Sequence, residues 1–169
     1  MSGKATALTG AASELRNRAA KAVAVFLIFA IVGPPIAALI AIGIIPFFEP
    51  GWSIVAENVE DSINGIGRLL SAAYFLGSLQ LGVTGFAAAL WLFFARRPRV
   101  SVILVLLTSF ATAVIAVFVL ANPMAMPAPD PGIVAAFLVL HVGAAIGCWL
   151  VANAVLRTWE WRHARMVTP

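Results

Sequence analysis

The chain has 169 residues, of which 62% are apolar and only 11% are charged, and its mean hydropathy is +1.01. This composition lies far outside the range of soluble globular domains and predicts a protein whose solvent is lipid. The net charge of +4 is explained by membrane topology and by contact with the lipid bilayer, so we expect no nucleic-acid partner.

Residues 1–12 are small or polar without periodicity, and we predict a disordered cytoplasmic tail there. Ser13 is a capping residue at the start of a run of helix formers. Beyond it, four apolar stretches reach the roughly 20 residues that a membrane-spanning helix needs. They cover residues 22–45, 69–95, 100–121 and 133–156, and none contains Asp, Glu, Lys or Arg. The predicted fold is all-α, an up-down bundle of four transmembrane helices over residues 13–156, followed by a tail over 157–169.

The basic residues predict the orientation of the bundle. Ten of the eleven lie in the amino-terminal segment, in the connection after the second stretch, or in the tail. The other two connections hold mainly acidic residues and the single Arg68. Because Lys and Arg are retained on the cytoplasmic side, we predict that both termini are cytoplasmic.

The first apolar stretch contains Gly33 followed by Pro34 and Pro35. Two adjacent prolines remove two backbone donors and clash with the preceding turn, which predicts a helix break. Two interpretations remain open. The break is a packing kink satisfied by neighbouring helices, or it is an unwound segment that binds a substrate or cation, as in broken transporter helices.

The connection over residues 46–67 carries apolar residues at helical spacing, with acidic residues on the other side. It predicts a short outer interfacial helix. Ser53 would cap its start, Trp52 would lie at the membrane interface, and residues 64–67 would form its end. The helix is either a surface element or a docking face for an outer partner. The second outer connection holds Met124 and Met126, which are too few to form a copper(I) site, and we predict no metal.

Small residues at four-residue spacing mark two helices as packing surfaces, because they let helix backbones approach closely in lipid. We predict helix contacts at Ser78, Gly82 and Gly85 in the second stretch and at Gly143 and Gly147 in the fourth. The facing helix belongs either to the same chain or to a second copy.

Polar residues at membrane depth are the default candidates for function. Gln80, Thr112 and His141 lie within about one turn of a common plane, which permits a polar layer. The layer is a structural interhelical hydrogen bond, a small-molecule or quinone-type site, or an axial haem site at His141. Bis-histidine haem ligation within one chain is excluded because His163 lies in the tail, and we expect no resident cofactor.

The apolar stretches contain no carboxylate to line an ion path or to orient a catalytic base, so we predict no enzyme activity. Cys148 is the only cysteine, which excludes a disulfide or a paired-cysteine redox centre.

Two segments carry a resemblance to a known group of proteins: Gly33-Pro34-Pro35-Ile36 and Ala73-Tyr74-Phe75-Leu76-Gly77-Ser78-Leu79-Gln80-Leu81-Gly82-Val83-Thr84-Gly85. They resemble small uncharacterised four-span proteins of alphaproteobacteria over about the first half of the chain. The resemblance implies a multi-pass protein of the bacterial inner (plasma) membrane and carries over no functional residue.

The leading functional hypothesis is an accessory or scaffolding subunit of a membrane assembly, with a membrane-protein partner or a second copy. The alternative is a small transporter or ligand-binding membrane protein that uses the Pro34-Pro35 break and the layer of Gln80 and His141. A third hypothesis is an enzyme or redox subunit that uses His141.

Overall fold

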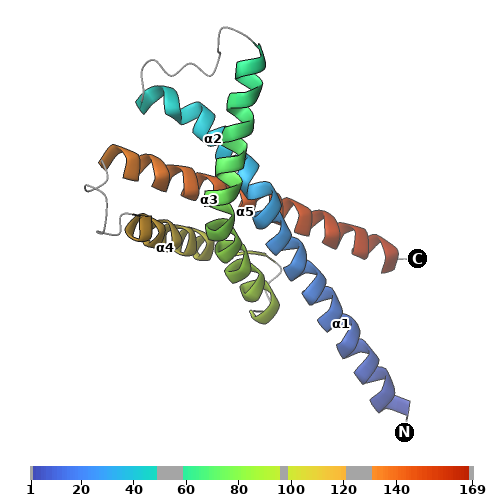
Figure 1. Cartoon of the computed structure of the whole chain (residues 1–169). Coiled ribbons are helices and arrows are strands. Elements are labelled where there is room, and N and C mark those ends of the chain that lie inside the picture. Colours follow the sequence, from blue (N-terminus) through green and yellow to red (C-terminus); the bar gives the residue numbers. More distant parts are fainter. Residues whose placement is uncertain (1, 49–58, 96–98, 121–130, 168–169) are drawn as a thin grey trace.

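The computed structural model describes residues 2–48, 59–95, 99–120 and 131–167. Within these ranges the chain forms four helical rods and no strand (Figure 1). The first rod is continuous and consists of α1 (Ser2–Leu27), a π-helix η1 (Ile28–Val32) and α2 (Gly33–Phe48). The other rods are α3 (Val59–Phe94), α4 (Val102–Leu120) and α5 (Pro131–Val167).

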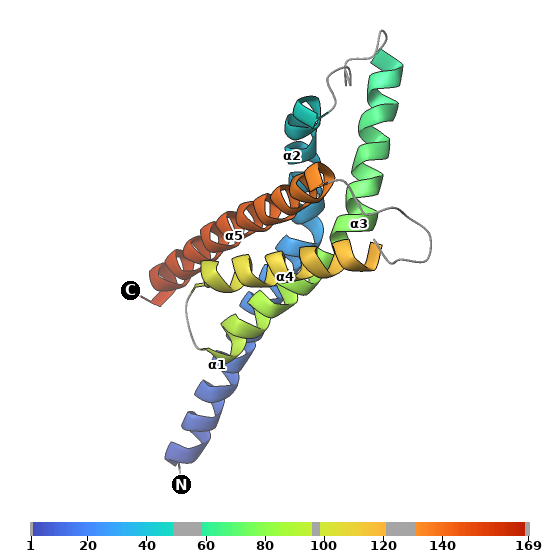
Figure 2. The ribbon, with the colours of Figure 1, turned by 90° about the vertical axis from the view of Figure 1, so that its left-hand side faces the viewer.

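The rods form a helical bundle in which α3 runs antiparallel to the first rod and α5 runs antiparallel to α4 (Figures 1 and 2). α3 packs against the first rod and against α4, while α5 packs against α4 and α2. The two ends of the chain point to the same side of the molecule in both views.

Three of the rods contain helices that are long and apolar enough to cross a membrane. The qualifying segments are Gly10–Gly43, Gly77–Phe94 and Val134–Arg162. α4 contains a shorter apolar helix over Val102–Val117. The chain is therefore consistent with a multi-pass membrane protein.

The prolines of the first rod follow directly on the π-helix η1. The ring of Pro34 would clash with the carbonyl of residue 30 in a regular α-helix, and widening the preceding turn relieves such a clash. The chain stays helical through Pro34 and Pro35, with Pro34 fully buried. The predicted break is thus a change of helix type, and no unwound segment lies between residues 28 and 48.

Two predicted boundaries differ from the structure. Residues 2–12 belong to α1 instead of a disordered tail, because alanines among them favour a helix that the following turns extend. α3 runs from Val59 without interruption, so residues 64–67 do not end a separate outer helix. Glycine costs a helix only about 1 kcal/mol, and a 36-residue helix tolerates that penalty. Ser53, Trp52, Met124 and Met126 lie outside the described residues.

The core of the bundle is built largely from small side chains, which lets the rods approach closely where lipid provides no hydrophobic driving force. Its buried alanines come from all four rods: Ala37, Ala38, Ala41, Ala88, Ala89, Ala113, Ala144, Ala145 and Ala152. Phe29, Leu81 and Leu156 are the largest fully buried side chains. Large apolar side chains on the outside, such as Leu39 and Phe94, fit a lipid-facing surface.

Candidate functional site

Glycines mark the closest contacts between the rods. A methyl group added at Gly85 of α3 would lie 2.5 Å from Cβ of Phe29 in η1. One added at Gly143 or Gly147 of α5 would lie 3.0 Å from an isoleucine of α2, Ile40 or Ile36 respectively. These three predicted packing residues are therefore contacts within the chain, at which only a glycine fits without a shift of its neighbour.

The other two predicted packing residues behave differently. A methyl group at Gly82 would meet no atom within 4 Å, so this glycine makes no close helix contact inside the described bundle. Ser78 is half-buried. Gly33 was assigned from the sequence only to the proline break. In the structure it lies where three helices meet, because a methyl group added there would lie 2.7 Å from Leu81 and 3.3 Å from Cys148.

His141 is almost completely buried in the bundle, with 3% of its surface exposed. Its Nδ1 lies 3.0 Å from the carbonyl oxygen of Phe137, one turn earlier in α5. Because a carbonyl only accepts, Nδ1 carries the proton, and Nε2 of the neutral ring is then an acceptor. Nε2 is buried without a hydrogen-bond partner. His141 therefore presents a free lone pair inside the bundle.

The predicted polar layer is not a hydrogen-bonded network. Among the described residues, no hydrogen bond joins Gln80, Thr112 and His141 to one another. Thr112 donates to the carbonyl of Ser109 within α4, at 3.0 Å, and Oε1 of Gln80 is buried without a partner. The hydroxyl of the fully buried Ser109 donates instead to the carbonyl of His141, at 3.2 Å, and so links α4 to α5.

Four other polar side chains of the apolar segments also donate to backbone carbonyls. Those that bind their own helix are Thr84, Thr108 and Asn153. Trp149 donates from Nε1 to the carbonyl of Val100 at 2.9 Å and fastens α5 to the start of α4. Asn153 was missed in the sequence, although an amide in an apolar run is itself a signal, and its Oδ1 is buried without a partner.

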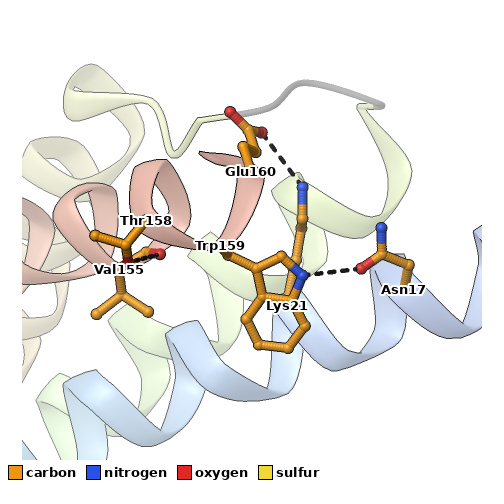
Figure 3. A network of polar contacts seen from close by, with 6 residues as sticks. All are labelled: Asn17, Lys21, Val155, Thr158, Trp159 and Glu160. Atoms are coloured by element: carbon orange, nitrogen blue, oxygen red, sulfur yellow. Dashed lines mark hydrogen bonds and ion pairs between the residues drawn. The ribbon is translucent and has the colours of Figure 1, made fainter. Parts of the chain in front are cut away.

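A second polar cluster joins α1 to α5 at the end of the bundle that holds both termini (Figure 3). Nε1 of Trp159 donates to Oδ1 of Asn17 at 3.2 Å, and Nζ of Lys21 lies 3.3 Å from Oε1 of Glu160. Both contacts lie just beyond the apolar part of the two helices. They hold the polar ends of the first and last rods together.

Two grooves flank α1. An apolar groove of about 430 Å³ lies between α1 and α3 and is lined by Ala19, Ala22, Val23, Phe26, Phe86, Ala89, Leu90 and Phe93. A second groove of about 420 Å³, in which most of the lining residues are polar, lies between α1 and α5 and is lined by Ser13, Glu14, Arg16, Asn17, Ala20 and Trp159.

Comparison with known proteins finds no family model, no curated protein and no solved structure that matches the chain.

Proposed function

We propose that this chain is a non-enzymatic, four-span protein of a bacterial inner membrane that serves as an accessory or scaffolding subunit of a membrane assembly. The observation that supports it is how the polar side chains of the spans are used. Ser109 of α4 donates to the carbonyl of His141 in α5, and Trp149 of α5 donates to the carbonyl of Val100, just before α4. Such bonds set helix register and position, which is what a scaffold requires.

The proposal includes α4 as the fourth span. α4 has 19 residues, and at 1.5 Å per residue it reaches about 28 Å, close to the thickness of the hydrocarbon core. The distribution of Lys and Arg supports cytoplasmic termini. The contact of Lys21 with Glu160 supports placing the beginning of the first rod and the end of α5 on the same side.

The face of α3 around Gly82 is the best candidate for contact with another subunit. A methyl group at Gly82 would meet no atom of the described bundle within 4 Å, and Leu79 nearby is 75% exposed. A small residue on an outer face lets a second helix approach closely, whereas contact with lipid tails alone does not require a small residue.

Replacing Gly82 by leucine is expected to leave the bundle folded and to abolish its assembly with partner subunits. Leucine has room inside the chain but would obstruct a close helix contact from outside. Native mass spectrometry of the protein, extracted gently from its own membrane, measures the assembly mass, and thermal melting measures the fold.

The matched control is Gly43→Leu in α2, a second glycine with nothing within 4 Å. It is expected to preserve both the fold and the assembly. A wild-type chain that is found alone, or an assembly that survives Gly82→Leu unchanged, would contradict the scaffold proposal at this face. An absorption spectrum of the same sample tests for a bound chromophore.

A second candidate function, a ligand-binding membrane protein, is favoured by the unpartnered acceptors in the bundle. Nε2 of His141 and Oε1 of Gln80 are both buried without a donor. A neutral molecule with hydroxyl or N–H groups would complement them. The proline segment adds no support, because it remains helical.

The double variant Gln80→Leu, His141→Leu separates these functions. Under the scaffold proposal it keeps its assembly and its phenotype, because neither side chain forms a hydrogen bond with another helix among the described residues. The free energy of unfolding is expected to change by less than about 1 kcal/mol, which is the usual range for a hydrogen bond between helices in a membrane. Loss of a bound small molecule with the fold and the assembly intact would favour the ligand-binding function.

A further inference from the structure

The polar groove between α1 and α5 is separate from the bundle interior and from His141. Its α1 side consists of Ser13, Glu14, Arg16, Asn17 and Ala20, and Trp159 supplies the α5 side. It lies where the two helices leave their apolar segments, so a group bound there would touch both the first and the last rod.

The charged side chains around the groove carry a net positive charge. Its one carboxylate, Glu14, is paired with Arg18 on the same helix. The nearby Glu160 is paired with Lys21. Arg16 lines the groove, is exposed, and forms no ion pair with any described residue. The groove therefore offers one unpaired guanidinium, which suits an anion.

An amide stands beside this guanidinium. Trp159 donates its ring N–H to Oδ1 of Asn17 and so fixes which way the amide faces (Figure 3). The amide nitrogen of Asn17 donates to no described residue, and Figure 3 shows it turned away from the ring. The hydroxyl of Ser13 is already donated to the carbonyl of Gly10. Arg16 and Asn17 are thus the available donors.

The depth of the groove matches the lipid headgroups. Arg16 lies six residues before Ala22, where the apolar run of α1 begins, which is about 9 Å along the helix. Trp159 lies three residues after Leu156, the end of the apolar run of α5, or about 4 to 5 Å. The headgroup layer extends roughly 5 to 8 Å beyond the hydrocarbon, and tryptophan is enriched there, so Trp159 lies within this layer and Arg16 at its outer edge.

We propose that this groove binds the phosphate of an anionic phospholipid from the adjoining leaflet. The guanidinium of Arg16 contacts two phosphate oxygens, the amide of Asn17 donates to the same group, and the ring of Trp159 lies against the glycerol region. A lipid fits better than a soluble or protein partner, because a headgroup is already held at this depth while any other ligand must displace it. This inference depends on the membrane location and not on the scaffold function.

The test measures binding of dioleoylphosphatidylglycerol to the full-length chain in detergent by native mass spectrometry. Arg16→Gln is expected to weaken this binding about fivefold, the factor that one cation contributes at a membrane surface. Arg16→Lys keeps the charge but loses the two-point contact, so its affinity should fall between those of the wild type and Arg16→Gln. Dioleoylphosphatidylcholine, which has no net charge, should bind more weakly than phosphatidylglycerol to the wild type.

Arg157→Gln is the matched control. Arg157 is also exposed and without an ion-pair partner among the described residues, but it does not line the groove. Its removal should weaken phosphatidylglycerol binding by less than about twofold. An equal loss in both variants, or equal binding of the two lipids, would show general surface attraction and overturn the proposal.

Two further outcomes assign the groove to another ligand. Displacement of phosphatidylglycerol by millimolar inorganic phosphate alone would indicate a free-anion site. A protein that copurifies with the wild type and is lost with Arg16→Gln, while lipid binding stays unchanged, would indicate a protein contact. Each result overturns the lipid assignment, and circular dichroism melting of every variant confirms that folding is retained.

Discussion

Gly85→Ala is expected to destabilise the folded bundle by about 2 to 3 kcal/mol, the upper range for overpacking a well-packed core. The added methyl would lie 2.5 Å from Cβ of Phe29 and 3.1 Å from its Cγ, distances that require a backbone shift. It would also lie 3.4 Å from the carbonyl oxygen of Phe26, so the helix cannot move freely to avoid it. Unfolding with increasing sodium dodecyl sulfate in mixed micelles measures the loss.

Gly82→Ala is the matched control, because it makes the same chemical change three residues earlier in α3. Its methyl would meet nothing within 4 Å, and alanine is the better helix former by about 1 kcal/mol. We expect stability that is unchanged or slightly higher. Equal destabilisation by both substitutions would mean that the contact between η1 and α3 does not control the stability of the bundle.

Phe29→Ala is expected to lower the stability of the folded bundle by about 2 to 3 kcal/mol. Phe29 is 0% exposed and is one of the largest fully buried side chains of the described core. In water the cost of such a truncation is about 3 to 5 kcal/mol. In lipid the contribution from transferring the ring out of water largely disappears, because lipid is as apolar as the core. The contributions of the cavity and of the lost packing contacts remain. The same detergent titration measures it.

The control for this substitution is Phe26→Ala, one turn earlier on the first rod. Phe26 is 36% exposed and lines the apolar groove toward α3. We expect a loss below about 1 kcal/mol, because lipid replaces the contacts that the ring makes. A loss as large as that of Phe29→Ala would mean that the burial of Phe29 does not determine its contribution to stability.

The two substitutions are also expected to interact. Once the ring of Phe29 is removed, the methyl of Gly85→Ala loses its clash with Cγ, so the double variant should be less destabilised than the sum of the single ones. Residues in contact show interaction energies of about 0.5 to 3 kcal/mol in such cycles. Phe29→Ala keeps Cβ, which lies 2.5 Å from the added methyl, so additive effects would show that the ring of Phe29 takes no part in the clash at Gly85.

The position of the π-helix affects the contact between Phe29 and Gly85. Phe29 is the second residue of η1 and lies four residues before Gly33, which the two prolines follow. The change of helix type alters the direction in which this side chain leaves the rod. The proline segment thereby sets the contact that Gly85 accommodates.

Much of the architecture is determined by the sequence alone. The apolar stretches predict the membrane-spanning segments because length and hydropathy are local properties that neighbouring helices do not alter. The prolines predict a disturbance of the first rod because the missing N–H and the ring clash are also local. The boundaries at residues 12 and 67 were wrong because a few poor helix formers do not end a helix that good neighbours extend.

Only the tertiary structure decides which small and polar residues meet. Gly82 and Gly85 share one spacing pattern but lie about 60° apart around α3, and this rotation separates an open surface from the tightest contact of the bundle. Likewise, Gln80 and His141 share a depth, yet His141 pairs through its backbone with Ser109. Sequence spacing determines the height of a residue in the membrane, whereas its direction depends on how each helix is rotated and tilted against its neighbours.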